Sequence, residues 1–596
     1  MNRLFPVSLV LTVVFLATYV FGANTARAET NIRFVIPDTD DDLRDAIRAA
    51  SLLSTARSSG TTAPQDLLAA AQADYARILG VLYGNAYYGG IINILVDGRE
   101  AANLQVLAPP PAIQTITVQV RPGRIYRFGT AEIAPLPPGT EQPEGFRTGA
   151  PAFSDTIGDA GSIAVDGWRA LGFATAEIAN QRITAEHANR RINARLAVAT
   201  GPRLRFGEVA ITGNEDVKTR RIRTISGLQP GLVFDPVEVD RAATRLRRTG
   251  SFASVTITEG TATGDEFPLT IEVVEATPRR FGFGAEVGTI EGVGLSGFWL
   301  HRNLLGGAER FRVDGEISGL GGETGGVDYS TGIRYERPAT PRADVDLFTE
   351  LQFEALDEPD FSSDTIEFTV GLTRFATEEL TVEAGVGYLF SQTTDAFGEE
   401  TFRLITLPLA AEYEKRDNSL NPTEGFFIDL DLTPFVGMSG SPSGGQLELD
   451  SRAYYSPNER FTFATRLQLG SLFGPSLAES PPFFRFFSGG GGTVRGQDFQ
   501  SLGVELNGET VGGRSFLGLS GEVRSNVTEE IQVVGFADWG YVGAEAFPDF
   551  SGNSHAGVGL GLRYNTGIGP IRLDVAKPVG GDGSGISILV GIGQAF

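Results

Sequence analysis

One arginine in a glycine-rich stretch is the first side chain whose chemistry can be read from the sequence. Arg495 lies in the segment 483–497, FFRFFSGGGGTVRGQ, between Val494 and the pair Gly496 and Gln497. Glycine reaches positive φ without steric penalty, so this segment is predicted to fold into a tight loop. A guanidinium group is always charged and presents five N–H donors. The pattern therefore predicts a loop that carries a fixed cation to acidic partners.

Two later segments supply candidate carboxylates through their alternation. Around Phe536, Asp538 and Gly540 every second residue is apolar, so these three share the opposite face. Glu522 likewise lies opposite the leucines of its own segment. Successive side chains of a strand point to opposite faces, so both carboxylates are predicted to face inward. A buried Arg495 would require such a counter-charge. A plainer interpretation, in which Glu522 only contributes to a polar interior, stays open.

An enzymatic site is the competing interpretation of these residues. Histidine occurs three times, at positions 187, 301 and 555 in separate segments, and cysteine does not occur. Nucleophilic catalysis needs a nucleophile, a base and an orienting group together. The sequence contains no P-loop or zinc-protease motif, and no nucleophile elbow in a plausible strand–helix context. We therefore expect no enzymatic activity, no metal site and no cofactor.

The charged residues lie in a C-terminal part made of short alternating segments. From residue 278 onward apolar residues alternate with glycine or polar residues, and the charges of the segment 571–575 share one face. Apolar residues facing out, with polar residues or glycine facing in, are typical of membrane barrels. Strands of about 9–11 residues would allow about sixteen in this length. We predict an all-β transmembrane barrel of about sixteen antiparallel strands over residues 278–596.

The preceding part carries a weak threefold repeat. Each copy has a helix, a glycine turn with an aromatic residue close by, and strands, and the three turns contain Gly84, Gly172 and Gly250. A repeat of these elements predicts small α+β modules, each with one helix layer on a short sheet. We place the modules at 29–110, 113–201 and 203–277.

The first 28 residues read as an export signal. Arg3 precedes an almost wholly apolar stretch, and Ala26-Arg27-Ala28 forms a cleavage site, which predicts a signal peptide over 1–28. An uncleaved membrane anchor is the alternative. No later apolar run approaches the roughly 20 residues that a membrane helix needs, so a membrane protein of this sequence would be a closed barrel. The net charge of −24 argues against a nucleic-acid partner.

Together these segments resemble the BamA/TamA superfamily of outer-membrane β-barrel assembly proteins, in which POTRA modules precede a barrel. Val494-Arg495-Gly496-Gln497 is similar to the loop motif V-R-G-[YF], and the segment 536–540 matches the strand motif F-x-D-x-G. The resemblance implies that Arg495 contacts Asp538, with Glu522 on the preceding strand as a second partner. Gln497 replaces an aromatic residue, which implies looser docking of the loop or docking through Phe499.

The resemblance also implies a function. Three modules make the TamA group the nearest match, so we expect a factor that inserts or secretes client barrels such as autotransporters. The implied partners are a TamB-like protein anchored in the inner membrane, unfolded outer-membrane clients and outer-membrane lipid. The implied location is the outer membrane of a Gram-negative bacterium, with POTRA repeats in the periplasm. A two-partner-secretion transporter and a passive pore are the alternatives.

The two ends of the barrel are the predicted working part. The first strand contains Phe281 and Phe283, and the last contains Gly591, Gly593 and Phe596. Glycine weakens a strand, because it adds entropy to the unfolded chain and has no side chain to pack. A seam that opens exposes strand edges that can template a client strand. In the alternative interpretation, Gly591 and Gly593 are only small residues on an inner face.

Overall fold

The structure is a computed structural model of the 596-residue chain. It describes residues 30–37, 39–288, 292–322, 325–506, 508–567, 569–580 and 585–592. The predicted signal peptide, 1–28, lies outside the described residues. The chain divides into two compact units, Met1–Arg203 and Leu204–Phe596. Within the described part, no helix is both long enough and apolar enough to cross a membrane.

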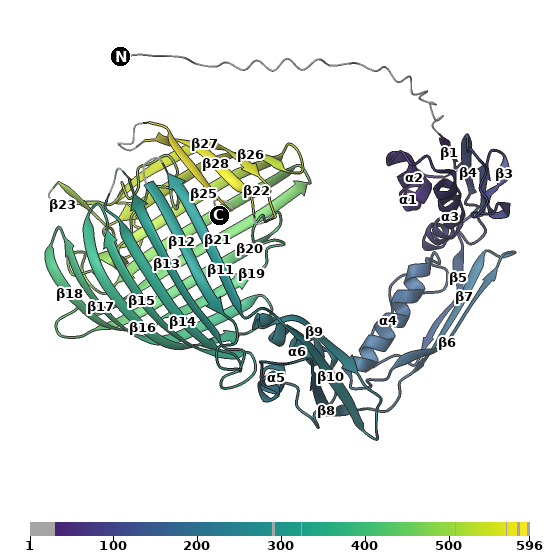
Figure 1. The fold of residues 1–596 in the computed structure, drawn as a ribbon, viewed down its shortest axis with the longest axis horizontal. Helices are drawn as coiled ribbons and strands as arrows, with labels where there is room; N and C mark the ends of the chain where they lie inside the picture. Colours follow the sequence, from purple (N-terminus) through teal and green to yellow (C-terminus); the bar gives the residue numbers. More distant parts are fainter. Residues whose placement is uncertain are drawn as a thin grey trace, which may run out of the picture. The chain divides into compact units, whose positions relative to one another are not determined.

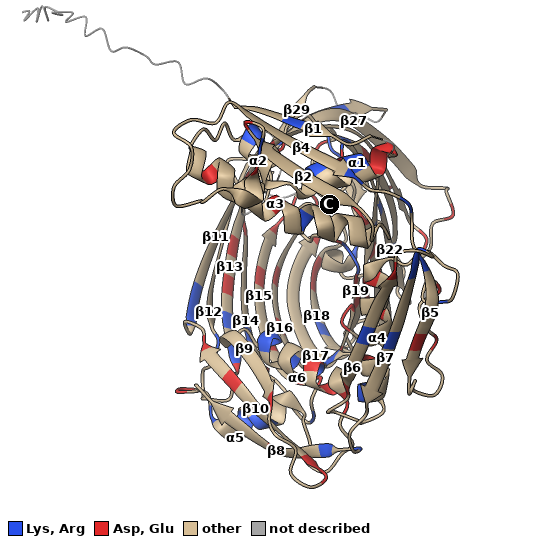
Figure 2. Cartoon of the chain, turned by 90° about the vertical axis from the view of Figure 1, so that its right-hand side faces the viewer, with Lys and Arg blue, Asp and Glu red and all other residues tan. Residues whose placement is uncertain are grey.

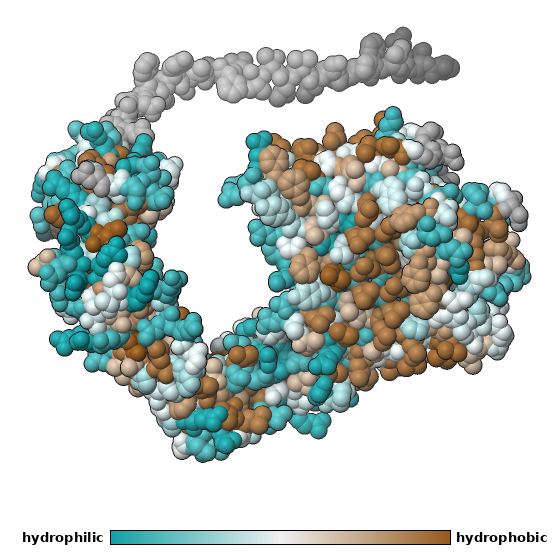
Figure 3. Space-filling model, turned by 180° about the vertical axis from the view of Figure 1, so that it is seen from behind, coloured by the Kyte–Doolittle hydropathy of each residue, from teal (hydrophilic) through white to brown (hydrophobic). Residues whose placement is uncertain are grey.

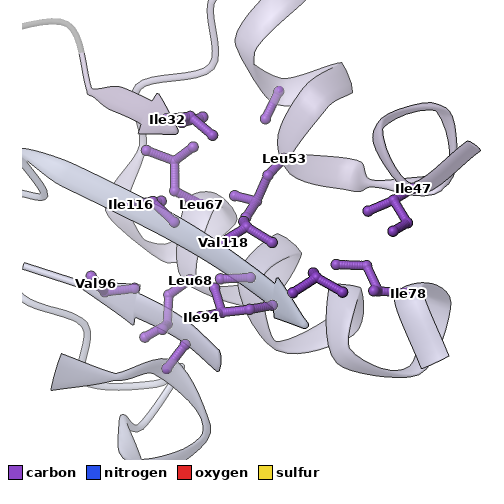
Figure 4. Close-up of a cluster of buried hydrophobic side chains, with 14 of the residues drawn as sticks. Ile32, Ile47, Leu53, Leu67, Leu68, Ile78, Ile94, Val96, Ile116 and Val118 are labelled. Atoms are coloured by element: carbon purple, nitrogen blue, oxygen red, sulfur yellow. The ribbon is translucent and has the colours of Figure 1, made fainter. Parts of the chain in front are cut away.

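The first unit begins with a module of helices packed on a four-stranded sheet (Figure 1). Its elements are β1 (Asn31–Val35), α1 (Asp41–Ala50), α2 (Leu52–Ser58), α3 (Pro64–Gly84), β2 (Ile91–Val96), β3 (Arg99–Glu100), the 3-10 helix η1 (Ala101–Asn103) and β4 (Thr115–Arg121). The sheet order is β1-β4-β2-β3, with β1 parallel to β4. Ile116 and Val118 alternate along β4 and meet Leu67 and Ile78 of α3 in the core (Figure 4). The amphipathic strand thus buries one face against the helix layer.

Two local features define the helices of this module. Asp74 of α3 is buried, and its carboxylate accepts hydrogen bonds from the Ser51 hydroxyl and from the backbone N–H of Leu52 and Leu53. The start of α2 is therefore capped by a side chain from another helix. The predicted glycine turn is wrong here, because Gly84 is the last helical residue and Ala86 adopts the left-handed conformation, with φ +64°.

The second module of this unit has one long helix on three strands. It comprises β5 (Arg127–Ala134), α4 (Ser154–Ala170), β6 (Glu177–Glu186) and β7 (Arg191–Ala199). The sheet order is β5-β7-β6, with β5 parallel and β6 antiparallel to β7. Gly172 has φ +95° directly after α4, as the repeat predicted. Ile157 of α4 and Phe128 of β5 lie in the core between helix and sheet.

The second unit opens with a module of the same plan. It comprises β8 (Arg205–Thr212), α5 (Thr219–Ser226), α6 (Pro236–Arg248), β9 (Phe252–Glu259) and β10 (Glu266–Glu275). The sheet order is β8-β10-β9, with β8 parallel and β9 antiparallel to β10. Gly250 has φ +68° and follows α6, which again matches the repeat. Ile222 of α5 and Leu246 of α6 are fully buried.

A closed antiparallel barrel follows in the second unit (Figure 1). Its strands are β11 (Arg279–Gly288), β12 (Gly292–His301), β13 (Arg310–Leu320), β14 (Asp328–Arg337), β15 (Val345–Asp357), β16 (Phe361–Phe375), β17 (Leu380–Asp395), β18 (Gly398–Thr406), β19 (Leu409–Glu414), β20 (Gly425–Gly437), β21 (Gly444–Asn458), β22 (Phe461–Phe473), β25 (Ser515–Asn526), β26 (Ile531–Gly543), β27 (Asn553–Tyr564), β28 (Ile571–Val579) and β29 (Ser587–Ile592). Both β18 and β19 pair with β17 and with β20, so they form one strand interrupted at Leu407 and Pro408. Proline lacks the N–H that the ladder needs. The described residues thus confirm the predicted fold class with sixteen strand positions.

The two faces of the barrel wall differ in polarity. Large apolar side chains of the wall are exposed in a band on the outside, where they are brown in Figure 3. Acidic residues mark β13 and β15 in Figure 2. An apolar outer face with charged residues on the inner face is the arrangement expected of a barrel in lipid.

Candidate functional site

The long loop between β22 and β25 lies in the barrel lumen and is held by its aromatic start. This loop contains the 3-10 helix η2 (Pro482–Phe484) and the short hairpin β23 (Val504–Leu506) and β24 (Glu509–Val511). The ring centroid of Phe483 lies 5.9 Å from that of Phe402 on β18, and the centroid of Phe484 lies 5.3 Å from that of Phe435 on β20. Aromatic pairs at such distances stabilise packing beyond their buried area. The start of the loop is therefore anchored to the inner wall.

Glycines let the loop approach the wall closely at its tip. Gly489, Gly490 and Gly496 have φ of +120°, +89° and +93°, which only glycine adopts readily. A Cβ at Gly496 would lie 2.8 Å from the carbonyl carbon of Lys577 on β28. Glycine at 496 thus meets two demands, a positive φ and direct contact between the loop backbone and the wall.

Arg495 is buried and forms ion pairs with two strands. Its side chain is 3% exposed. Its Nε donates to Oδ2 of Asp538 on β26 at 2.8 Å, and its Nη2 donates to Oδ1 at 2.9 Å. Its Nη1 donates to Oε1 of Glu522 on β25 at 2.7 Å, and its backbone N–H also donates to Asp538. The paired geometry at Asp538 is the fork that makes arginine–carboxylate bonds strong and directional.

The ion pairs extend to three further charged residues whose pairing the sequence did not indicate. Asp574 of β28 lies 3.5 Å from Nη1 of Arg495, and Arg563 of β27 donates to Asp574 at 2.5 Å. Arg524 of β25 donates from Nε to Glu522 at 2.8 Å. The resulting cluster, called the loop cluster below, is almost completely shielded from solvent and contains Arg495, Arg524, Arg563, Glu522, Asp538 and Asp574. Three cations balance three carboxylates, so the group carries no net charge that burial would penalise.

The remaining predicted motif residues shape the space around Arg495. The Phe536 ring centroid lies 3.6 Å from the Arg495 guanidinium carbon, which places the cation over the ring face. Val494 is fully buried. A Cβ at Gly540 would lie 2.2 Å from the Ser488 hydroxyl and 2.9 Å from a methyl of Val494, so glycine leaves room for the loop.

Gln497 docks the loop through hydrogen bonds, where the family resemblance implied looser docking or docking through Phe499. The side chain is 2% exposed, and its amide nitrogen donates to the carbonyls of Ala556 at 2.7 Å and Gly580 at 2.9 Å. Two buried bonds to main-chain carbonyls hold this position firmly. Phe499 instead lines a cavity beside the first barrel strands.

In the part of the chain that the structure describes, the two ends of the barrel meet along a short ladder. Val287 pairs with Val590 and Gly288 with Leu589, and these are the pairs between β11 and β29 in the described residues. By contrast, the register of β11 with β12 runs from Arg279–His301 to Gly288–Gly292. We call this short ladder the seam.

The predicted seam residues take different positions. Phe281 and Phe283 on β11 are 62% and 90% exposed on the lipid-facing side. Gly591 is buried and pairs with Arg572 of β28. Gly593 and Phe596 lie outside the described residues.

Two family descriptions match this chain. The model described as "Omp85 superfamily domain" matches residues 303–596, and the POTRA model described as "Surface antigen variable number repeat" matches residues 204–276. The chain belongs to the Omp85 superfamily.

Individual relatives of this superfamily chain agree with the assignment. The outer membrane protein assembly factor BamA of Neorickettsia risticii (strain Illinois) is 23% identical over 415 residues, which cover 65% of this chain and 54% of the relative. The chain thus spans about half the length of that curated relative. A BamA structure from Haemophilus ducreyi that lacks POTRA domains 1–3 is 16% identical, with a TM-score of 0.60 over 78% of this chain and 100% of that one. CdiB from Acinetobacter baumannii gives a TM-score of 0.52 at 14% identity, over 79% of this chain and 90% of that one. These likenesses show the shared fold.

Superfamily membership fixes the location of the chain. This Omp85 protein is an outer-membrane β-barrel whose POTRA repeats lie in the periplasm. The module at residues 204–276 therefore lies at the periplasmic end of the barrel, as do the barrel turns that it contacts.

Arginines on the last helix of that POTRA repeat hold it against the barrel. Arg245 of α6 donates from Nη2 and Nε to Asp344, in the turn between β14 and β15, at 2.6 and 2.9 Å. Arg248 donates to the same carboxylate at 3.3 Å and stacks over the Phe375 ring at 3.5 Å. Burial raises the pKa of Asp344, but the hydrogen bonds and charges of the two arginines outweigh burial and hold that pKa below its ordinary value. The repeat and the barrel are thus joined by a charged clamp.

The three histidines do not come together. His187 faces Tyr126 in the second module, with 2.8 Å between its Nδ1 and the phenol oxygen, and His301 ends β12. His555 of β27 contacts the Ser488 hydroxyl at 2.9 Å. In the part of the chain that the structure describes, no group of three or more His, Cys, Asp or Glu side chains is arranged to hold a metal ion. In the described residues, the site holds a loop to the barrel wall through buried ion pairs.

Proposed function

We propose that this protein assembles client β-barrel proteins into the outer membrane by opening at the seam between β11 and β29. The observation that carries the proposal is that the first and last barrel strands close on each other, with Val287–Val590 and Gly288–Leu589 as their pairs in the described residues. Unpaired strand edges recruit further strands through backbone hydrogen bonds. An incoming client strand would pair with a freed edge of the seam, and its barrel would bud off when closed. The process needs no catalytic group, and we propose that the protein is not an enzyme.

The loop cluster supports this proposal by keeping the rest of the wall intact. Arg495 links the loop to β25 and β26 and comes within 3.5 Å of Asp574 on β28. Buried, paired charges resist separation, because breaking one pair leaves an uncompensated charge. We infer that the role of Val494, Arg495, Gly496 and Gln497 is to hold β25–β28 together while the seam opens. Asp538, Glu522, Phe536 and Gly540 receive the loop.

The same proposal assigns the POTRA repeats and the partners that they would bind. We propose three POTRA repeats at 29–110, 113–201 and 203–277 and a barrel at 278–596, an arrangement that favours the TamA group. The edge strands β6 and β9 offer open sheet edges for strand addition. A TamB-like protein that spans the periplasm would dock there, and autotransporters would be among the clients. Outer-membrane lipid surrounds the apolar band and would receive the inserted client.

Reconstitution tests the proposal. The purified protein would be placed in phospholipid vesicles and supplied with a urea-unfolded autotransporter barrel. We expect the client to become protease-protected and heat-modifiable faster than in empty vesicles. An equal rate in empty vesicles and in vesicles with the protein would contradict the proposal.

Planar-bilayer conductance separates the proposal from a two-partner-secretion transporter or a passive pore. The aromatic side of the loop packs against the lumen wall in a cluster with Phe486, Phe516 and Leu472. A lumen filled in this way is expected to give brief, low conductance. A large and steady open state would favour a pore.

A further inference from the structure

An ion pair reaches across the last strand of the barrel at the seam. Arg572 of β28 donates from Nη2 to Oε1 of Glu286 on β11 at 2.5 Å. These strands are not neighbours, because β29 lies between them. Adjacent strands lie about 4.7–4.9 Å apart, so the pair bridges a gap of roughly twice that distance. Long side chains reach this far only if nothing stands between them.

Gly591 provides the open space. It pairs with Arg572 in the register of β28 and β29. One step along the register that pairs Val287 with Val590, Gly591 also faces Glu286. The three residues thus form one row across three strands. A Cβ at Gly591 would lie 3.0 Å from Nε of Arg572 and 3.4 Å from Oε1 of Glu286. Any larger residue there would press between the two charges.

We propose that Glu286, Gly591 and Arg572 form a latch that holds the seam closed. The proposal rests on the proposed function for the importance of the seam, but the latch itself is a property of the barrel alone. The bond from Arg572 joins β11 to β28 directly and so adds to the described pairs between β11 and β29. The Glu286 side chain is 53% exposed, and that of Arg572 is 13% exposed. A pair this open to water is weak enough to break and re-form.

The negative charge beside β11 explains why Arg572 matters more than Glu286 for holding the seam closed. A cavity of about 850 Å³ beside β11 is lined by many carboxylates and, among its described lining residues, by no lysine or arginine. Its acidic residues are Glu286, Glu316, Asp328, Glu354, Asp357 and Glu358. Arg572 therefore offsets the repulsion that Glu286 meets from these carboxylates. Without Arg572, β11 would lose an attraction and keep that repulsion.

Hydrogen exchange of β11 and β29 in lipid nanodiscs tests the latch without any client. Amides in a ladder exchange in proportion to the population of the open state. We expect Glu286→Gln to speed exchange about two- to five-fold, the range for an exposed ion pair, and Arg572→Gln to speed it more. Glu286→Gln, on the more exposed partner, gives the result even if Arg572→Gln fails to insert. Unchanged exchange in Glu286→Gln would overturn the latch.

Two companion variants exclude a general structural effect. The charge swap Glu286→Arg with Arg572→Glu should restore slow exchange, because the attraction is the same with the charges reversed. Asp314→Asn removes a pair of comparable exposure, Arg312–Asp314 on β13, and should leave seam exchange unchanged. If the swap exchanges as fast as Glu286→Gln, or if Asp314→Asn is equally fast, the latch is wrong.

In Gly591→Val, the direction of the change in hydrogen-exchange rate at the seam distinguishes the latch from a strand weakened only by glycine. Valine favours strands more than glycine does, so a strand weakened only by Gly591 would become tighter. The latch predicts the opposite, faster exchange, because valine separates the two charges. Slower exchange in Gly591→Val would overturn the proposal.

The same variants separate the latch from the proposed function. Faster exchange with an unchanged rate of client assembly would support the latch and count against assembly through the seam. Faster exchange with a changed assembly rate would support both.

Discussion

Arginine–carboxylate ion pairs join the barrel wall both at the loop cluster and at the seam, but they hold the two regions with different strength. In the loop cluster, arginine–carboxylate bonds are buried, and Arg495 is 3% exposed. At the seam, Arg572 bonds Glu286, whose side chain is 53% exposed. Water screens the second pair strongly and the first hardly at all. Burial thus decides whether an ion pair acts as a permanent tie or as a bond that can open.

One strand belongs to both regions. Asp574 and Arg572 lie on the inner face of β28, where Asp574 joins the loop cluster and Arg572 crosses the seam. Because the buried bond to Arg563 holds β28 against β27, β28 can stay in place when its exposed ion pair to β11 breaks. The comparison predicts that charges on the two sides of β28 differ in how much they stabilise the barrel.

Arg495→Ala should have the largest effect. It leaves Asp538 buried without the arginine that pairs with it and leaves Glu522 with Arg524, and removing one member of a buried pair destabilises by about 3–5 kcal/mol. We expect the barrel to insert but to unfold at lower temperature in heat-modifiability gels, with client assembly impaired. Arg312→Ala, at a half-exposed pair, is the matched control. Normal thermal stability and client assembly in Arg495→Ala would show that the loop cluster is dispensable.

Asp574→Asn should have a smaller effect. It weakens the hydrogen bond from the fully buried Arg563 and removes a charge near Arg495, and a hydrogen bond to a charged group contributes about 1.5–3 kcal/mol. A double-mutant cycle with Arg495→Ala should show coupling, because both residues belong to one network. Additive losses would mean that Asp574 acts independently of the loop.

Asp344→Asn at the periplasmic clamp should have the smallest effect, about 1 kcal/mol, because about a third of that carboxylate is exposed. Its pKa is depressed in the folded protein, so its stabilisation is present above the unfolded value of about 3.9. The stabilisation is lost as pH falls through the lower folded value. Urea-dependent proteolysis at the repeat–barrel junction should therefore distinguish Asp344→Asn from the parent at pH 7 and not well below pH 4. A difference that persists in acid would exclude Asp344 ionisation as its cause.

Much of the architecture could be predicted from local patterns, and the exceptions have physical causes. Alternation and segment length are properties of each strand alone, and they led to the sixteen strands. The same alternation placed Asp538 and Glu522 inward, and the structure places both against Arg495. The repeat's glycine turn does not hold at Gly84, where the short side chain of Ala86 adopts the left-handed conformation instead.

Residues that act across strands could not be found in this way. The inward face of Asp574 and Arg572 was visible in the alternation, but their partners depend on which strands become neighbours and in what register. Glu286 is 286 residues from Arg572 in the sequence, while Arg563 reaches Asp574 from the neighbouring strand. The docking of Gln497 also could not be predicted, because the main-chain carbonyls of Ala556 and Gly580 that accept its hydrogen bonds have no signature in the sequence.

Locking the seam tests the central claim most directly. The chain has no native cysteine, so Val287→Cys with Val590→Cys can form one disulfide across the paired seam residues. Val287→Cys with Val293→Cys, which joins β11 to β12, is the matched control. Oxidation of the seam pair should reduce client assembly to the level of empty vesicles, reductant should restore it, and the control should stay active throughout. Assembly at the full rate with the seam pair fully oxidised would contradict the account.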